Sequence, residues 1–121
     1  MMRKLYDCDV GCPVQNTLQF IAGKWKGVIL YHLFENTVLR FSELQEKLPY
    51  VSKRMLAKQL AELEDDGVIH KTVYPVVPVK TEYRVTKFGA TLKPVIQAMA
   101  VWGEDYADKV HSRTNDGADE S

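Results

Sequence analysis

Apolar residues recur at intervals of three and four along most of the chain, which is the spacing of helices that bury one face. This pattern predicts helices over residues 13–22, 24–34, 43–48 and 53–65, and a last helix that starts after Thr86. Pro94 should kink or restart that last helix, because proline has no amide hydrogen to donate. Runs rich in β-branched residues predict strands over residues 68–74 and 79–85, and a further short strand is expected over 39–41. We therefore expect one α+β domain that is mostly α.

Residues that start and stop helices stand at the edges of these segments. Ser42, Ser52 and Thr86 can each accept a hydrogen bond from a backbone amide of the helix that follows. Pro13 suits the first position of the first helix. Gly67 suits the position just after the fourth helix, where a left-handed backbone is common.

The third and fourth predicted helices are separated by four residues, Pro49-Tyr50-Val51-Ser52. Two short helices joined in this way have the spacing of a helix-turn-helix. The last two strands flank Pro75-Val76-Val77-Pro78 and predict a hairpin with a stiff tip. The pattern thus predicts a winged helix-turn-helix whose wing sheet has two or three strands.

The helix over residues 53–65 carries a candidate DNA-reading face. Arg54, Ala57, Lys58 and Ala61 project opposite Leu56, the centre of its apolar stripe. Long cations can reach phosphates or guanine edges, while alanines let a helix axis approach base edges in the major groove. The predicted DNA-binding residues are Ser52, Lys53, Arg54, Ala57 and Lys58 in this region, with Lys80, Thr81 and Arg84 in the wing.

A cationic helix face is often only a solvated face, so the order of charges matters here. Basic residues occupy the N-terminal half of this helix, whereas Glu62, Glu64 and Asp65 crowd its C-terminal half. The helix dipole favours the opposite order. We therefore interpret the order as a sign of DNA contact.

An apolar stripe also runs along the predicted terminal helix, and it is larger than a monomer of 121 residues needs at its end. We predict that it forms the interface of a homodimer. The predicted interface residues are Phe88, Leu92, Ile96, Met99, Trp102 and Tyr106. The chain then divides into an N-terminal arm over residues 1–12, the winged domain with its dimerisation helices over 13–111, and a disordered acidic tail over 112–121.

Composition and charge limit the classes of function that the chain can have. The formal net charge is zero, but residues 1–103 hold 14 Lys and Arg against 10 Asp and Glu, so the body is mildly basic. No segment resembles a signal peptide or a membrane span, so we expect a cytoplasmic protein without membrane contact. The two cysteines and three scattered histidines lack zinc-site spacing, and no catalytic motif occurs. We expect no metal, no cofactor and no enzymatic activity.

Several short motifs occur in an order that resembles the HxlR-type winged-helix regulators over residues 12–102. They are Cys12-Pro13, Gly23-Lys24-Trp25, Arg40-Phe41, Glu43-Leu44, Leu63-Glu64 with Gly67, Glu82-Tyr83 and Trp102. The resemblance implies a homodimeric, cytoplasmic repressor or activator that binds a pseudo-palindromic operator in double-stranded DNA with the second helix of its motif. The segment Pro78-Val79-Lys80-Thr81 departs from the family pattern at the wing tip.

The same resemblance points to Cys12, since some members sense oxidants or electrophiles through a cysteine at this place. A thiol at a helix N-terminus favours the reactive thiolate. Cys8 can resolve an oxidised Cys12, or Cys12 can bridge to the other subunit. Against this, Asp7 and Asp9 flank Cys8, and their negative charges raise the pKa of a thiol and so disfavour the thiolate. An unreactive packed Cys12 stays an equal alternative, and the inducer is unknown.

A different class of function stays open beside DNA binding. Winged helices also serve as protein-protein interaction modules without specific DNA binding. The graded charge of the helix over residues 53–65 favours the DNA-binding interpretation.

Overall fold

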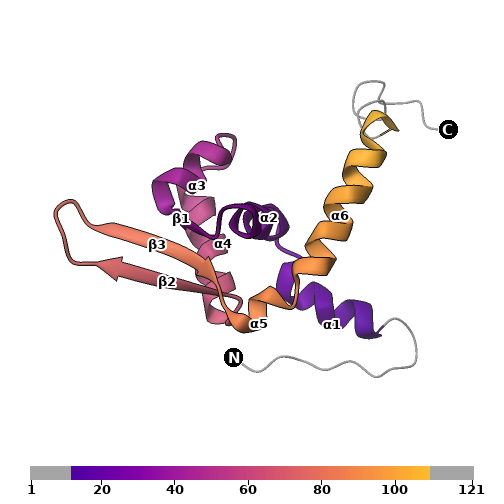
Figure 1. Ribbon diagram of the computed structural model, residues 1–121, viewed down its shortest axis with the longest axis horizontal. Helices are drawn as coiled ribbons and strands as arrows, with labels where there is room; N and C mark the ends of the chain where they lie inside the picture. The colour runs from indigo at the N-terminus through magenta and orange to yellow at the C-terminus, as the bar shows by residue number, and fades with distance from the viewer. Residues whose placement is uncertain (1–11, 110–121) are drawn as a thin grey trace.

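Helices and strands follow one another in the order that the sequence predicts (Figure 1). The protein is represented by a computed structural model that describes residues 12–109. The elements are α1 (Cys12–Ile21), α2 (Lys26–Asn36), β1 (Val38–Arg40), α3 (Phe41–Lys47), α4 (Lys53–Asp65), β2 (Ile69–Tyr74), β3 (Lys80–Val85), α5 (Lys87–Ala90) and α6 (Lys93–Asp105). Except for Cys12, the predicted arm lies outside the described residues, as does the predicted acidic tail.

The sheet has three strands in the order β1-β3-β2, all paired antiparallel. Leu39 pairs with Tyr83 and His70 pairs with Arg84. Because β1 precedes the helix-turn-helix and β3 follows it, this pairing brings the segments on either side of α3 and α4 together. The fold is therefore the predicted winged helix-turn-helix, with the three-stranded form of the wing sheet.

The core forms around α2, which lies in the middle of the molecule (Figure 1). It packs against α3, α4, α6 and the sheet. The most deeply buried side chains include Ile29, Leu30, Leu33, Leu44, Leu48, Leu56, Leu60, Leu63 and Val68. Each such side chain contributes about 1.5–3 kcal/mol through removal from water. Burial of the leucine stripe on α4 turns the opposite face of that helix to solvent.

Three predicted helix boundaries are confirmed, those at Ser52, Thr86 and Gly67, whereas α2 begins and ends two residues later than predicted. The Ser52 hydroxyl accepts a bond from the Met55 amide at 3.0 Å, and the Thr86 hydroxyl accepts one from the Gly89 amide at 2.9 Å. Gly67 has a φ of 77°, the left-handed conformation that favours glycine.

The prediction that Ser42 caps the third helix is wrong. This helix begins at Phe41, and the backbone amide of Arg40 donates a 2.8 Å hydrogen bond to the Glu43 carboxylate. Pairing of β1 with β3 extends through Arg40, which leaves Ser42 inside α3 with an exposed side chain.

The terminal segment also differs in part from the prediction. It forms two helices, α5 and α6, and Pro94 lies in the first turn of the second, so the chain restarts there. Leu92 and Ile96 are only 9% and 2% exposed, because they pack into the core of their own chain. These two residues are therefore removed from the predicted dimer surface.

Within residues 12–109, none of the helices has the length and apolar character needed to cross a membrane.

Candidate nucleic-acid interface

The outer face of α4 presents the predicted recognition residues to solvent. Ser52, Lys53, Arg54, Ala57 and Lys58 are all exposed. Within the described part of the chain, the three cations among them form no ion pair. Cations without an ion-pair partner beside small residues suit contact with phosphates and base edges.

A groove of about 570 Å³ lies between the wing and the helix-turn-helix. It brings together Lys53, Lys80 and Thr81, which were predicted to bind DNA although they are distant in sequence. Arg40 also lines it, together with Ser42 and Gln45. A groove that carries three cations is suited to the polyanionic DNA backbone.

Arg40, Ser42 and Gln45 were not among the predicted contacts. Arg40 occurs in a motif shared with the family, but no local pattern indicated that its side chain faces the wing. The proximity arises from pairing of β1 with β3, where Arg40 lies opposite Glu82.

In the wing, Glu82 organises the two predicted cations. Its carboxylate lies 3.6 Å from Lys80 Nζ and 3.8 Å from Arg84 Nη2, and it accepts a 3.1 Å hydrogen bond from the Tyr74 hydroxyl. Lys80 also lies over the Tyr74 ring, 4.7 Å from its centroid. Arg84 does not line the groove. The wing cations are thus partly neutralised, in contrast to those of α4.

Groups with shifted pKa values lie away from the outer face of α4, except Glu62 at its edge. A hydrogen bond from Lys26 lowers the pKa of the Glu62 carboxyl. Burial lowers the pKa of His32, with a further contribution from Lys47. Burial raises the pKa of Tyr83, with a further contribution from Glu64. No cluster of His, Cys, Asp and Glu in the range 12–109 has the arrangement of a metal site.

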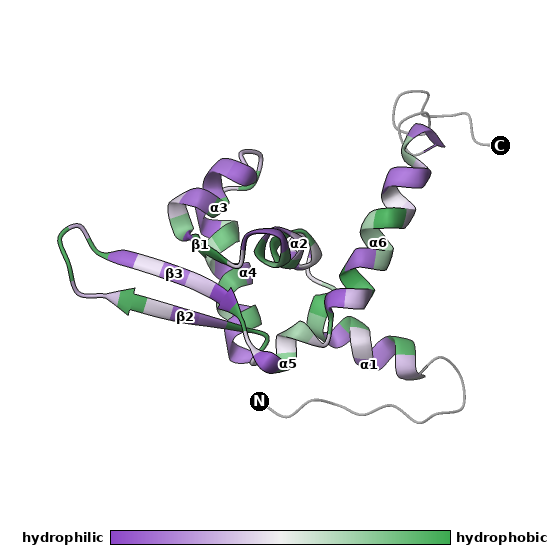
Figure 2. Ribbon diagram, in the orientation of Figure 1, coloured by the Kyte–Doolittle hydropathy of each residue, from purple (hydrophilic) through white to green (hydrophobic). Residues whose placement is uncertain are grey.

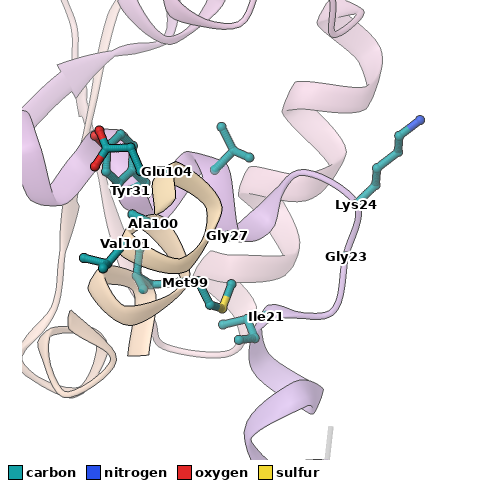
Figure 3. Close-up of a pocket in the computed structure, with 11 residues that line it drawn as sticks. Ile21, Gly23, Lys24, Gly27, Tyr31, Met99, Ala100, Val101 and Glu104 are labelled. Carbon is teal, nitrogen blue, oxygen red and sulfur yellow. The ribbon is translucent and has the colours of Figure 1, made fainter. Parts of the chain in front are cut away.

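A second groove, of about 550 Å³, lies between α2 and α6 (Figure 3). Ile21, Val28, Ile96, Met99 and Val101 give it a largely apolar lining. In Figure 3 the Lys24 side chain extends away from the groove. Exposed apolar residues also occur on α1 and on α6 with its C-cap, namely Val14, Leu18, Met99, Val101, Trp102 and Tyr106. Figure 2 shows the resulting hydrophobic segments along α6.

Known proteins with this architecture identify the family. The family model described as HxlR-like helix-turn-helix matches residues 20–111. The chain belongs to this family. The uncharacterised HTH-type transcriptional regulator YdeP of Bacillus subtilis is 54% identical to this HxlR-like chain over 100 residues, which cover 83% of the chain and 77% of YdeP.

Solved structures extend the likeness to three dimensions. The redox regulator HypR in its reduced form has a TM-score of 0.76 and 46% identity, covering 83% of this chain and 98% of that one. Its oxidised form has a TM-score of 0.73 and 48% identity, covering 78% and 96%. As an HxlR-like helix-turn-helix protein, the chain is a DNA-binding transcription regulator and not an enzyme.

Of the two predicted redox residues, Cys12 lies within the described part of the chain and Cys8 does not. Cys12 is the first residue of α1, which agrees with its predicted place at a helix N-terminus. Cys8 lies outside the described residues.

Proposed function

We propose that this HxlR-like regulator binds a specific operator as a homodimer, with α4 in the major groove and the wing on the adjacent backbone. The unpaired cationic face of α4 carries the proposal. Lys53, Arg54 and Lys58 provide charge there, while Ala57 and Ala61 keep the surface low enough for close approach to bases.

The groove between the wing and α3 supports the second part of the proposal. Arg40, Lys53 and Lys80 line this groove and would face a phosphate backbone once the recognition helix enters the adjacent major groove. Thr81, Ser42 and Gln45 add neutral groups that can donate hydrogen bonds to phosphate oxygens.

Dimerisation is proposed through the exposed apolar surface of α1 and α6. Met99 is 48% exposed, Trp102 60% and Tyr106 49%, a large apolar surface for one short helix. Val14 and Leu18 of α1 are exposed as well. We propose that a second copy of the chain covers these residues by two-fold symmetry. Phe88 is 48% exposed and packs edge-on against Phe20, with 5.4 Å between the ring centroids.

Redox or electrophile sensing through Cys12 is proposed as the way this regulator is controlled. HypR, the redox regulator to which the chain is similar, was solved in oxidised and reduced forms. The position of Cys12 at the start of α1 agrees with a sensing thiol, because a helix N-terminus stabilises thiolate. Since α1 adjoins the proposed dimer surface, modification there would alter the spacing of the two recognition helices.

The central experiment selects bound fragments from random DNA duplexes and then titrates the selected duplex against a scrambled one across a salt series. A DNA-binding dimer should prefer the selected duplex, whose half-sites should lie about 10 bp apart or a multiple of that. Its affinity should fall steeply with salt, by a slope near −0.9 for each phosphate contact. An interaction module without DNA specificity should enrich no sequence and show little retention on DNA.

A further inference from the structure

A lysine is buried at the start of α2, just after the connection from α1. Lys26, the first residue of α2, is only 8% exposed, and its Nζ lies 2.8 Å from Oε1 of Glu62 on α4. Lysine is almost never buried unless it is paired. The side chain of Glu62 is 40% exposed, so its carboxylate lies at the boundary between this buried partner and solvent.

A second polar side chain strengthens the same link. Gln59 of α4 is 6% exposed, and its Oε1 accepts a 3.1 Å hydrogen bond from the backbone amide of Trp25. Its Nε2 donates a 3.5 Å hydrogen bond to Glu62. Trp25 and Lys26 therefore contact α4 on two successive turns, at Gln59 and at Glu62.

Glu62 stands four residues after Lys58, so the two side chains are neighbours on the helix surface. Lys58 belongs to the exposed recognition face, whereas Glu62 lies on the flank between that face and the core. If Glu62 had no other partner, it would attract the Lys58 ammonium and place a negative charge beside the DNA phosphates. The ion pair holds the Glu62 carboxylate beside the Lys26 ammonium, and Lys58 forms no ion pair with it among the described residues.

We propose that Lys26 is a positioning residue for DNA recognition, which keeps the Glu62 carboxylate away from Lys58 and thereby leaves Lys58 free to contact a phosphate. This inference rests on the proposed function, because it requires that α4 is the DNA-reading helix. It assigns a role in DNA binding to a residue that is itself too buried to contact DNA.

The test uses the full chain and its selected duplex, with affinity measured across a salt series. Lys26→Met keeps an unbranched side chain, one atom shorter, and removes its charge. We expect affinity to fall roughly three- to tenfold and the salt slope to become shallower by about 1, the loss of one phosphate contact. Lys26→Met with Glu62→Gln should restore both values, because the carboxylate that captures Lys58 is then absent. Glu64→Gln on the same helix is the charge-matched control and should not rescue Lys26→Met.

A double-mutant cycle separates this role from a general effect on folding. If Lys26 acts through Lys58, Lys26→Met should have little further effect on affinity in a Lys58→Met background. Full additivity of the two substitutions would overturn the inference, as would unchanged affinity and salt slope in folded Lys26→Met.

A further variant covers the case in which Lys26→Met does not fold. Glu62→Gln alone should bind DNA as the wild type does, since Lys26 already neutralises the carboxylate. A marked gain of affinity in Glu62→Gln would contradict the inference, because it would show that Glu62 opposes DNA binding in the presence of Lys26. Wild-type protein that lacks DNA affinity would instead refute the proposed function itself.

Discussion

The backbone amide of Trp25 donates a hydrogen bond to the side chain of Gln59, and Gly23 provides the space in which this bond forms. A Cβ at Gly23 would lie 2.5 Å from Gln59 Oε1 and 2.9 Å from Lys26 Cδ. Both distances are too short for real contacts, so these two buried side chains would have to shift. The absence of a Cβ at Gly23 therefore favours the arrangement in which Gln59 accepts the Trp25 amide.

Gly23→Ala should therefore lower the free energy of unfolding by about 1–3 kcal/mol, the cost of leaving a partly buried amide without its acceptor. Chemical denaturation measures this change. Gly103→Ala is the matched control, because its added Cβ meets nothing within 4 Å. In the helix interior it should be neutral or stabilising by up to about 1 kcal/mol. Equal effects of the two substitutions would show that the space at Gly23 is unimportant.

Substitutions in α4 and in the wing should affect DNA binding differently. Arg54→Ala should cost about 1–3 kcal/mol of binding free energy and relax the preference at one base pair, if its guanidinium meets a guanine edge. Lys80→Ala and Arg84→Ala should weaken selected and scrambled duplexes by similar factors, since phosphate contacts carry no base information. Titration of both duplexes measures this difference. Unchanged affinity in both Arg54→Ala and Lys58→Ala would contradict the proposed orientation of α4.

The stability of the protein should depend on the Lys26–Glu62 pair at acid pH. The hydrogen bond from Lys26, followed by the charges of Lys26 and Lys58, lowers the pKa of Glu62 below its ordinary 4.5. Because the folded-state pKa is lower than the unfolded one, the pair stabilises the fold above pH 4.5 and loses this contribution as pH falls below it. Denaturation of wild type and Glu62→Gln at several pH values should show a difference that shrinks below pH 4.5. A difference that stays constant down to pH 2 would contradict this assignment.

Trp102→Glu should shift the protein from dimer to monomer. The side chain is 60% exposed and its ring lies 4.9 Å from that of Tyr106, so the change removes aromatic surface and adds a charge to the proposed interface. Sedimentation velocity at micromolar concentration measures the assembly state, and Val77→Glu at the fully exposed wing tip is the control. The folded monomer should bind the full operator weakly and a half-site normally. A wild type that sediments as a monomer would refute the dimer.

Oxidation should release DNA from the wild type if Cys12 is the sensing thiol. Diamide treatment before a binding titration tests this, with Cys12→Ser as the variant that should be insensitive. Release from Cys8→Ser as well as from wild type would show that Cys12 acts without Cys8. A Cys12 pKa near the ordinary ~8.5, together with binding that diamide leaves unchanged, would make Cys12 a packing residue.

The order and type of the elements could be predicted from the sequence because the signals are local. Leucine spacing on α4, the caps Ser52 and Thr86, and Gly67 after the helix act over one or two turns, and all are found where expected. The outward position of Arg54 and Lys58 follows from the same periodicity, since a buried stripe determines the opposite face.

The remaining features of the fold and of the site depend on contacts between residues that are distant in sequence. Pairing of Val38–Arg40 with β3 makes the sheet three-stranded, brings Arg40 to the wing groove and moves the start of α3 ahead of Ser42. Packing of α6 on α2 buries Ile96 while Trp102, further along the same apolar stripe, stays exposed. Lys26 resembles any surface lysine in the sequence, and only the approach of α4 gives it Glu62 as a partner. Hydrophobic periodicity specifies which face of a helix is buried, but the partner on that face depends on contacts between segments distant in sequence.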